Sequence, residues 1–416
     1  MHAEARAAEE RRSARRGWSV VAGAFGVMFA CFGCTYCFSA FFTPLQEAFT
    51  ASRAALSWIF SIAVFLYFVL GAVSGPLADR LGPRGMTLAG VAIIGLGLLV
   101  ASRAEALWQI YLGYGLGVGI GIGFACVPAI GAVQRWFVRR RGLASGIAVS
   151  GIGVGTLVMP KVAEWLIEAL DWRGAFLALG LFSILGGGLA ALFIDGSPER
   201  HGFLPDGGVA APDVARAPAH GMTLGETVRS RAFRFLYAAC FFISIGLFIP
   251  FVHLVPHAQD QGIPYATAVT LFTLVGVGST VGRFALGGLA DRLGRKRSLA
   301  LMYLGVAVMM GWWFISREAW QIAAFALIYG TFYGGFVALA PALLVDYFGP
   351  KNASGIIGFA YTGVAVGTLL GPSLAGYAFD LTGSYAVPIA VSALFSAVAA
   401  ALVWMAPEPG AAGRAA

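Results

Sequence analysis

Charged residues are scarce in this chain of 416 residues. Asp, Glu, Lys and Arg make up 12% of it, whereas they make up about a quarter of a typical soluble domain. Hydrophobic residues make up 59%, and the mean hydropathy is +0.80. A soluble protein needs more charged residues than this on the surface that faces water. The composition therefore excludes a soluble globular protein and indicates an integral membrane protein.

Cysteine and histidine are also rare, with five residues of each. All the cysteines fall in apolar runs, so no disulfide framework is expected. Three of them are spaced like metal ligands (Cys31, Cys34, Cys37), but they lack a partner cluster and are read as small core residues. We predict no metal site, no cofactor and no enzymatic activity, because only His253 and one arginine lie well inside an apolar run.

Twelve apolar runs are long enough, or nearly so, to cross a hydrocarbon core of about 30 Å. The first follows a basic stretch, but its roughly 26 residues exceed the ~7–15 of a signal peptide's apolar region, so it is predicted to stay as a first helix. The sequence therefore predicts an all-α membrane protein with twelve transmembrane helices, at 17–42, 57–78, 86–102, 107–134, 142–169, 173–194, 233–257, 265–290, 297–316, 320–345, 352–377 and 384–405.

The net charge of +8 is the difference between 28 Lys and Arg residues and 20 Asp and Glu residues. The positions of the basic residues indicate whether this charge binds a partner or orients the chain in the membrane. With a cytoplasmic N-terminus, 22 of them fall in the tails and inner loops and two within spans (Lys161, Arg283). Such a bias predicts a multi-pass protein of the plasma (inner) membrane with both termini cytoplasmic, and it implies no nucleic-acid partner. The remaining four lie in outer loops: Arg53, Arg103, Arg173 and Arg317.

The chain repeats itself at an offset near 212 residues. GPLADRLG at 75–82 returns as GGLADRLG at 287–294, WQI at 108–110 returns at 320–322, and VGTL at 154–157 returns at 366–369. A parallel repeat of six helices indicates two bundles around an axis normal to the membrane, with a binding site between them near the midplane. We predict an N-terminal six-helix bundle over 1–194, a cytoplasmic linker over 195–231, and a C-terminal six-helix bundle over 232–416.

Arg283 is the most informative residue, because it lies inside the apolar stretch 269–289. An arginine stays charged, and a charge at membrane depth costs about 2.5–3.5 kcal/mol on the insertion scale, so it marks a functional site by default. A guanidinium binds a carboxylate through two parallel hydrogen bonds. With Ser279 one turn before it, Arg283 is predicted to bind an anionic substrate; the alternative is an ion pair with another helix.

The two repeated loops, GPLADRLGPR and GGLADRLGRK, resemble the loop signature of the major facilitator superfamily. Four further stretches resemble its monocarboxylate transporter family and the related oxalate/formate exchangers: GWSVVAGAF at 17–25, FF at 41–42, DWRGAF at 171–176 and DLTGSY at 380–385. The resemblance covers essentially the whole chain. It implies the major facilitator fold, transport by alternating access, an arginine in the eighth helix that binds the substrate carboxylate, and a functional monomer.

Three positions depart from the family patterns. Animal members have a lysine in the first helix where this chain has Tyr36, and an aspartate in the eighth helix where it has Ser279. The oxalate exchangers have a lysine in the eleventh helix where it has Val364. One cation suits one carboxylate, so a monoanion is favoured over oxalate. With the proton-coupling residues of the family absent, the proton is assigned to the substrate carboxylate at Arg283 or to His253.

Tyrosines are candidates for the rest of the substrate site, with packing as the alternative for each. Tyr329 and Tyr333 are one turn apart in the tenth helix, and Tyr36 and Tyr361 come from helices one and eleven, which line the cavity in this superfamily. His253, between Pro250 and Pro256, is a candidate carboxylate contact. Conformational gating is assigned by the resemblance to the inner-loop residues Asp79, Arg80, Asp291 and Arg292, whereas Lys161 is expected to pair with Glu164 or to reach the membrane surface.

These observations predict a secondary active transporter that moves a small monocarboxylate, of the L-lactate or pyruvate type, together with a proton. An organic anion exchanger of the oxalate/formate type is the first alternative. A drug exporter of the same superfamily is the second, although such a carrier would not need a lone buried arginine. The predicted partners are the carboxylate, the proton and the lipid bilayer.

Overall fold

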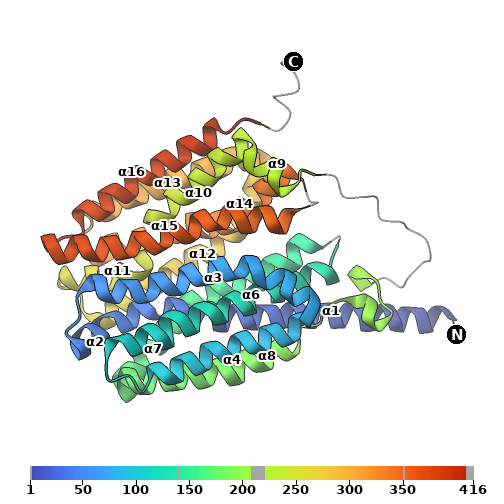
Figure 1. The fold of residues 1–416 in the computed structure, drawn as a ribbon, viewed down its shortest axis with the longest axis horizontal. Helices are drawn as coiled ribbons and strands as arrows, with labels where there is room; N and C mark the ends of the chain where they lie inside the picture. Colours follow the sequence, from blue (N-terminus) through green and yellow to red (C-terminus); the bar gives the residue numbers. More distant parts are fainter. Residues whose placement is uncertain (1, 139, 208–220, 350–351, 409–416) are drawn as a thin grey trace.

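Long helices lie side by side along the longest axis of the molecule (Figure 1). The computed structural model describes residues 2–138, 140–207, 221–349 and 352–408. The α-helices are α1 His2–Tyr36, α2 Phe38–Phe49, α3 Arg53–Leu81, α4 Pro83–Ala101, α5 Leu107–Ile110, α6 Gly119–Trp136, α7 Arg141–Phe182, α8 Gly188–Leu192, α9 Leu224–Arg229, α10 Arg231–Leu247, α11 Ile249–Asp260, α12 Tyr265–Leu293, α13 Arg295–Ile315, α14 Ala319–Phe348, α15 Ala353–Thr382 and α16 Ala386–Met405. Two π-helical segments, η1 Tyr111–Val118 and η2 Ser183–Gly187, and two 3₁₀ turns, η3 Pro198–His201 and η4 Pro205–Gly207, complete the helical elements.

Within the described residues, 11 helical stretches are long and apolar enough to cross a membrane. One of them, Arg141–Leu192, has 52 residues, which is more than twice what a single crossing needs. It bends at Asp171, which has a φ of 64° and a ψ of 177°. The Asp171 carboxylate accepts hydrogen bonds from the backbone N–H groups of Arg173 (2.6 Å) and Gly174 (3.0 Å), so it caps a new helix. This stretch is therefore the predicted fifth and sixth spans, and the multi-pass architecture agrees with the sequence.

Two of the crossings are interrupted midway, at equivalent places in the repeat. The α1/α2 crossing breaks at Cys37, and the α10/α11 crossing breaks at Phe248, where Pro250 opens α11. Since proline has no N–H to donate, the break at Phe248 frees carbonyl groups at the end of α10. At the Cys37 break, the carbonyl groups of Cys34 and Thr35 accept hydrogen bonds from the Tyr114 hydroxyl. At membrane depth such freed backbone groups need partners inside the protein. The breaks therefore place polar backbone in the centre of the molecule.

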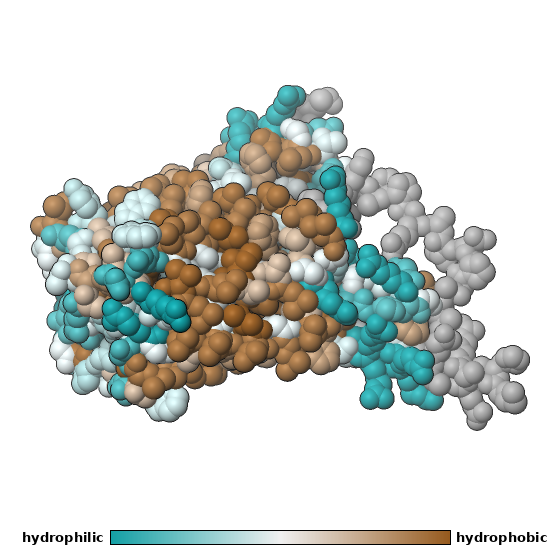
Figure 2. Space-filling model, turned by 60° about the horizontal axis from the view of Figure 1, so that its bottom comes forward, coloured by the Kyte–Doolittle hydropathy of each residue, from teal (hydrophilic) through white to brown (hydrophobic). Residues whose placement is uncertain are grey.

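A broad belt of hydrophobic residues separates two more hydrophilic ends on the face shown in Figure 2. We call the end that carries the N-terminal helix start and the turns at Gly82 and Gly294 the basic end, because Arg80, Arg84 and Arg292 lie there. We call the opposite end, where α3 begins and α11 and α15 finish, the far end. The belt is the surface expected of a protein whose middle section contacts the hydrocarbon core of a lipid bilayer.

The two sequence repeats contact each other most extensively through the helix pairs α3 with α15 and α7 with α12, and also through α2 with α11. On the other side of α12 lies α14, so close that a Cβ added at Gly334 would lie 2.1 Å from the Ser279 carbonyl oxygen. Helix α12 is thus held between α7 and α14, and its small residues allow this close packing. The predicted linker over 195–231 includes residues 208–220, which lie outside the described residues.

Candidate functional site

Arg283 lies on α12 and is 6% exposed, yet its guanidinium has no hydrogen-bond partner among the residues that the structure describes. All three guanidinium nitrogens are buried without a hydrogen-bond acceptor, and one turn away the Ser279 hydroxyl is also buried without a partner. A buried charge that is neither paired nor hydrogen-bonded is strongly unfavourable. The alternative of an ion pair with another helix finds no support among the described residues. These two groups are free to bind an anion.

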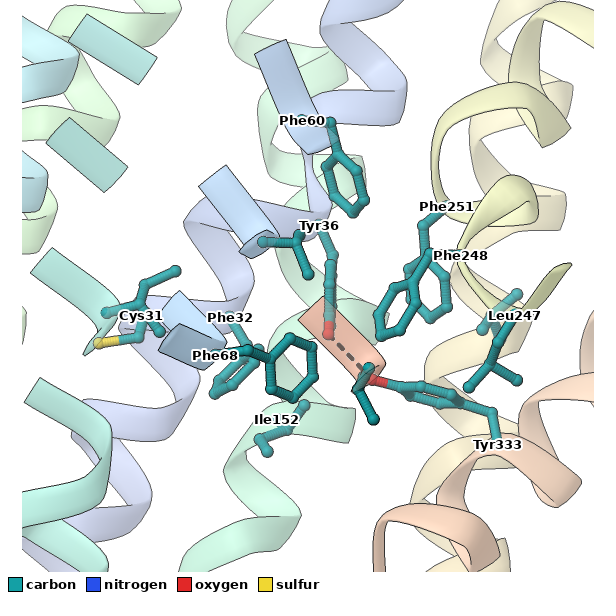
Figure 3. Close-up of a cluster of buried hydrophobic side chains, with 14 of the residues drawn as sticks. Cys31, Phe32, Tyr36, Phe60, Phe68, Ile152, Leu247, Phe248, Phe251 and Tyr333 are labelled. Atoms are coloured by element: carbon teal, nitrogen blue, oxygen red, sulfur yellow. Dashed lines mark hydrogen bonds between the residues drawn. The ribbon is translucent and has the colours of Figure 1, made fainter. Parts of the chain in front are cut away.

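Two tyrosine hydroxyls meet at the centre of the molecule. The hydroxyl of Tyr36, at the end of α1, lies 2.9 Å from the hydroxyl of Tyr333 on α14. Figure 3 shows the two rings pointing toward one another from different helices, with Phe248 and Phe251 beside them. The Phe251 ring centroid is 4.5 Å from that of Tyr36 and 5.0 Å from that of Tyr333. Aromatic rings therefore enclose a small polar spot made by residues from both sequence repeats.

The tyrosine pair and Arg283 belong to one electrostatic neighbourhood. The ionisable groups that interact with the Arg283 charge are the hydroxyls of Tyr333, Tyr36 and Tyr67. Tyr361 on α15 interacts in turn with Tyr333 and Tyr67. The structure thus brings together four residues that the sequence proposed, and it adds Tyr67 on α3. Sequence reasoning missed Tyr67 because nothing in its apolar run distinguishes this tyrosine from a packing residue.

Helix α7 closes the other side of the arginine. A Cβ added at Gly153 would lie 2.2 Å from the Thr280 hydroxyl oxygen and 3.0 Å from Nη1 of Arg283. Only a residue without a side chain leaves room there for the guanidinium. The glycine that immediately precedes the VGTL repeat thus faces the substrate-binding candidate across the interface between α7 and α12.

Tyr329 and His253 have their polar atoms bound within the protein. The Tyr329 hydroxyl donates to the Leu247 carbonyl, a group at the end of α10 next to the break at Phe248. His253 lies on α11, where Nδ1 is 2.9 Å from the Tyr385 hydroxyl and Nε2 is 2.9 Å from the Pro372 carbonyl oxygen. Both ring nitrogens of His253 are therefore occupied in this conformation.

The remaining candidates lie away from the centre. Lys161 forms an ion pair with Glu164 at 2.6 Å, and its side chain is half exposed, so the prediction of this pair is confirmed. Arg80 and Arg292 are exposed at the basic end, near the ends of α3 and α12. The side chains of Asp79 and Asp291 lie outside what the structure describes, and the gating role of all four residues stays a prediction. The part of the chain that is described contains no group of three or more His, Cys, Asp or Glu side chains that could hold a metal ion.

The groups at the centre of the molecule have the chemistry that a small anion with an apolar body requires. The guanidinium supplies a fixed charge and paired donors, which match a carboxylate, and the surrounding tyrosine and serine hydroxyls supply further donors. The aromatic rings exclude water, so each of these interactions is stronger than at a surface. A binding site between helices of both repeats is also where a two-bundle carrier holds its substrate.

Comparisons with known proteins show what this chain is similar to. The family model of the Major Facilitator Superfamily matches residues 24–317 and 234–416. The chain is 30% identical to monocarboxylate transporter 13 of Rattus norvegicus over 383 residues, which are 91% of this chain and 86% of the relative. It is also 30% identical to monocarboxylate transporter 11 of Mus musculus, with coverage of 91% and 85%. Among solved structures, it is similar to a bacterial homolog of the human lysosomal transporter Spinster, with a TM-score of 0.71, 15% identity, and coverage of 94% and 97%.

Proposed function

Because this chain belongs to the major facilitator superfamily, and within it to the monocarboxylate transporter family, we propose that it carries a small monocarboxylate, such as L-lactate or pyruvate, together with a proton. It does so by alternating access, with residues 1–194 and 232–416 moving as two bundles about the central site. The bias of basic residues toward one side supports a plasma (inner) membrane location with both termini cytoplasmic. The transporter works as a monomer.

One observation carries the proposal: the buried guanidinium of Arg283 has no hydrogen-bond partner in the described part of the chain. The substrate carboxylate supplies the missing acceptors, and Ser279, Tyr36 and Tyr333 donate or accept further hydrogen bonds. Tyr361 and Tyr67 complete the aromatic wall. A site with one cation holds one carboxylate, which favours a monocarboxylate over a dicarboxylate such as oxalate.

Coupling to a proton follows from the charge of the substrate. Moving a bare anion into a negative interior costs about 2.3 kcal/mol per 100 mV, which disfavours uptake by roughly 50-fold. A proton that travels with the carboxylate removes this penalty. The proton is carried by the carboxylate bound at Arg283 or by His253, which is fully buried in the α10/α11 crossing.

Uptake of labelled L-lactate and pyruvate into proteoliposomes, with an inward proton gradient, tests the proposal. Arg283→Gln removes the charge while keeping a polar side chain, and Arg103→Gln, at an exposed position, is the matched control. Losing two charge-assisted hydrogen bonds, each worth about 1.5–3 kcal/mol, lowers the uptake efficiency by about 100-fold or more. Uptake that needs an internal anion and ignores the proton gradient would establish an exchanger instead. No transport of either acid would refute the substrate assignment.

A further inference from the structure

One arginine makes several of the contacts that join the two sequence repeats at the far end of the molecule, beside a hydrogen bond from the Thr43 hydroxyl to the Gln259 side chain at 2.6 Å. Arg53, the first residue of α3, donates from Nη1 and Nη2 to the two carboxylate oxygens of Asp260 at 2.6 and 2.7 Å. Nη1 also donates to the Tyr385 hydroxyl at 2.8 Å, and the guanidinium lies 3.8 Å from the centre of the Phe379 ring. All three partners belong to the C-terminal repeat, whereas Arg53 belongs to the N-terminal one.

The same contact extends to the backbone of α3. Both carboxylate oxygens of Asp380, on α15, accept hydrogen bonds from N–H groups of the first turn of α3, those of Arg53 (2.9 Å) and Ala54 (2.8 Å). A carboxylate at a helix N-terminus satisfies free N–H groups and interacts favourably with the helix dipole. At the basic end, by contrast, the ion pair Arg16–Asp195 joins the N-terminal bundle to the first residue of the linker, and Arg295–Asp346 lies within the C-terminal bundle.

We infer that this cluster, the far-end latch, holds the two repeats closed at the far end, and that His253 is the site where a proton opens it. The latch consists of Arg53, Asp260, Asp380, Tyr385 and His253. The inference goes beyond the substrate site and rests on the proposed alternating access, because a latch between two bundles has a role only if they separate there.

The direction of the hydrogen bonds around His253 shows why a proton matters. The Ser57 hydroxyl donates to the Arg53 carbonyl at 2.6 Å, so toward Nε2 of His253, 3.1 Å away, the Ser57 oxygen acts as an acceptor. The Pro372 carbonyl at 2.9 Å is also an acceptor, so Nε2 carries the hydrogen. Because Arg53 donates to the Tyr385 oxygen, the Tyr385 hydrogen is directed to Nδ1. The closed latch is therefore matched to a neutral imidazole with one particular tautomer.

A second proton on His253 breaks this match. A protonated Nδ1 faces the Tyr385 oxygen as a donor, so the tyrosine loses its acceptor, and a second cation then shares Tyr385 with Arg53. The other groups that interact with His253 are Asp380 on α15 and His257 on α11. The carboxylates cannot compensate without releasing α3, because Asp380 binds the α3 N–H groups and Asp260 binds the guanidinium. Protonation thus favours the open form, in which water can solvate the imidazolium.

The far-end latch is tested by measuring the distance between the two repeats without any substrate. Spin labels are placed at Glu105 and Glu318, exposed positions at the far end on different repeats, after the native cysteines have been replaced. Distance distributions are recorded in lipid nanodiscs at about pH 7.5 and about pH 5, on either side of the ordinary histidine range. We expect a short distance to dominate at neutral pH and a longer one to grow several-fold in acid.

Variants separate the latch from the proton site. Arg53→Gln should shift the population toward the long distance by about tenfold or more at both pH values, as expected for lost charge-assisted hydrogen bonds. Asp260→Asn, a milder change, should shift it in the same direction, and Arg103→Gln should leave it unchanged. His253→Gln should keep the short distance at both pH values, whereas His201→Gln, a histidine at the basic end, should leave the acid response intact.

Two results would overturn the inference. A distance that does not respond to Arg53→Gln or to Asp260→Asn, in variants that elute as folded monodisperse protein, would show that no latch exists. An acid response that persists in His253→Gln would place the proton site elsewhere. Because no carboxylate is present, neither result bears on substrate binding at Arg283.

Discussion

Replacing Arg283 with methionine should make the transporter more stable and inactive at the same time. The unaltered protein buries a guanidinium without a partner, at a cost of about 2.5–3.5 kcal/mol on the insertion scale, whereas methionine fills a similar stem volume without charge. We expect a gain of roughly 2–3 kcal/mol in the free energy of unfolding. With an unfolding entropy of about 2.1 cal/mol/K per residue, a chain of 416 residues gains about 1 °C per kcal/mol, so the Tm should rise by roughly 2–3 °C.

Thermal unfolding in detergent measures this effect, with and without a large excess of L-lactate or pyruvate. A ligand at about 100 times its Kd stabilises the native state by about 2.7 kcal/mol, so the Tm of the unaltered protein should rise with ligand. The Tm of Arg283→Met should be insensitive to it, and Arg103→Met, at an exposed position, should behave like the unaltered protein. A lower Tm for Arg283→Met without ligand would refute the reasoning, since it would mean that the guanidinium has a stabilising partner in the protein.

Two further predictions concern the walls of the site. Tyr333→Phe should raise the KM for uptake by about tenfold, since one hydrogen bond to a charged group is lost. Tyr329→Phe should leave the KM unchanged and lower the free energy of unfolding by about 1 kcal/mol. Equal effects of the two variants on the KM would contradict the different placement of the two hydroxyls. Gly153→Ala should abolish uptake, because its Cβ would lie 2.2 Å from the Thr280 hydroxyl oxygen. The control Gly142→Ala, on the same helix, places its Cβ where no atom lies within 4 Å, so it should transport normally. Normal uptake by both variants would show that close packing of α7 against the site is not required.

The site also explains why the arginine is tolerated in the folded protein. The guanidinium is enclosed by aromatic rings and hydroxyls, and Gly153 gives it room, so the protein holds an unfavourable charge in a fixed position. Because the guanidinium would gain its hydrogen-bond acceptors only when the substrate binds, these hydrogen bonds would contribute to the free energy of binding. We propose different tasks for the central charge and the far-end latch, one to attract the anion and the other to control access to it.

The sequence was informative about the spans because bilayer thickness sets the length of an apolar run. It did not show which residues near the ends of helices contact the other repeat. Arg53 counted only as one of four basic residues in outer loops, although the structure shows it at the contact between the repeats. Similarly, His253 stood out as a buried histidine, but its partners could not be read from the chain, since Tyr385 lies 132 residues away in sequence.

What the sequence by itself determined is the class of protein and the central charge. Hydropathy identified the membrane spans, the internal repeat indicated two related halves, and a lone arginine in an apolar run marked the substrate candidate, because each of these follows from local composition. Only the tertiary structure decided that Tyr36 meets Tyr333 across 297 residues, that the Arg283 guanidinium has no partner, and that Arg53 ties the repeats together. These depend on how helices distant in the chain pack against each other, and the spacing along one helix carries no information about which residue faces it from another.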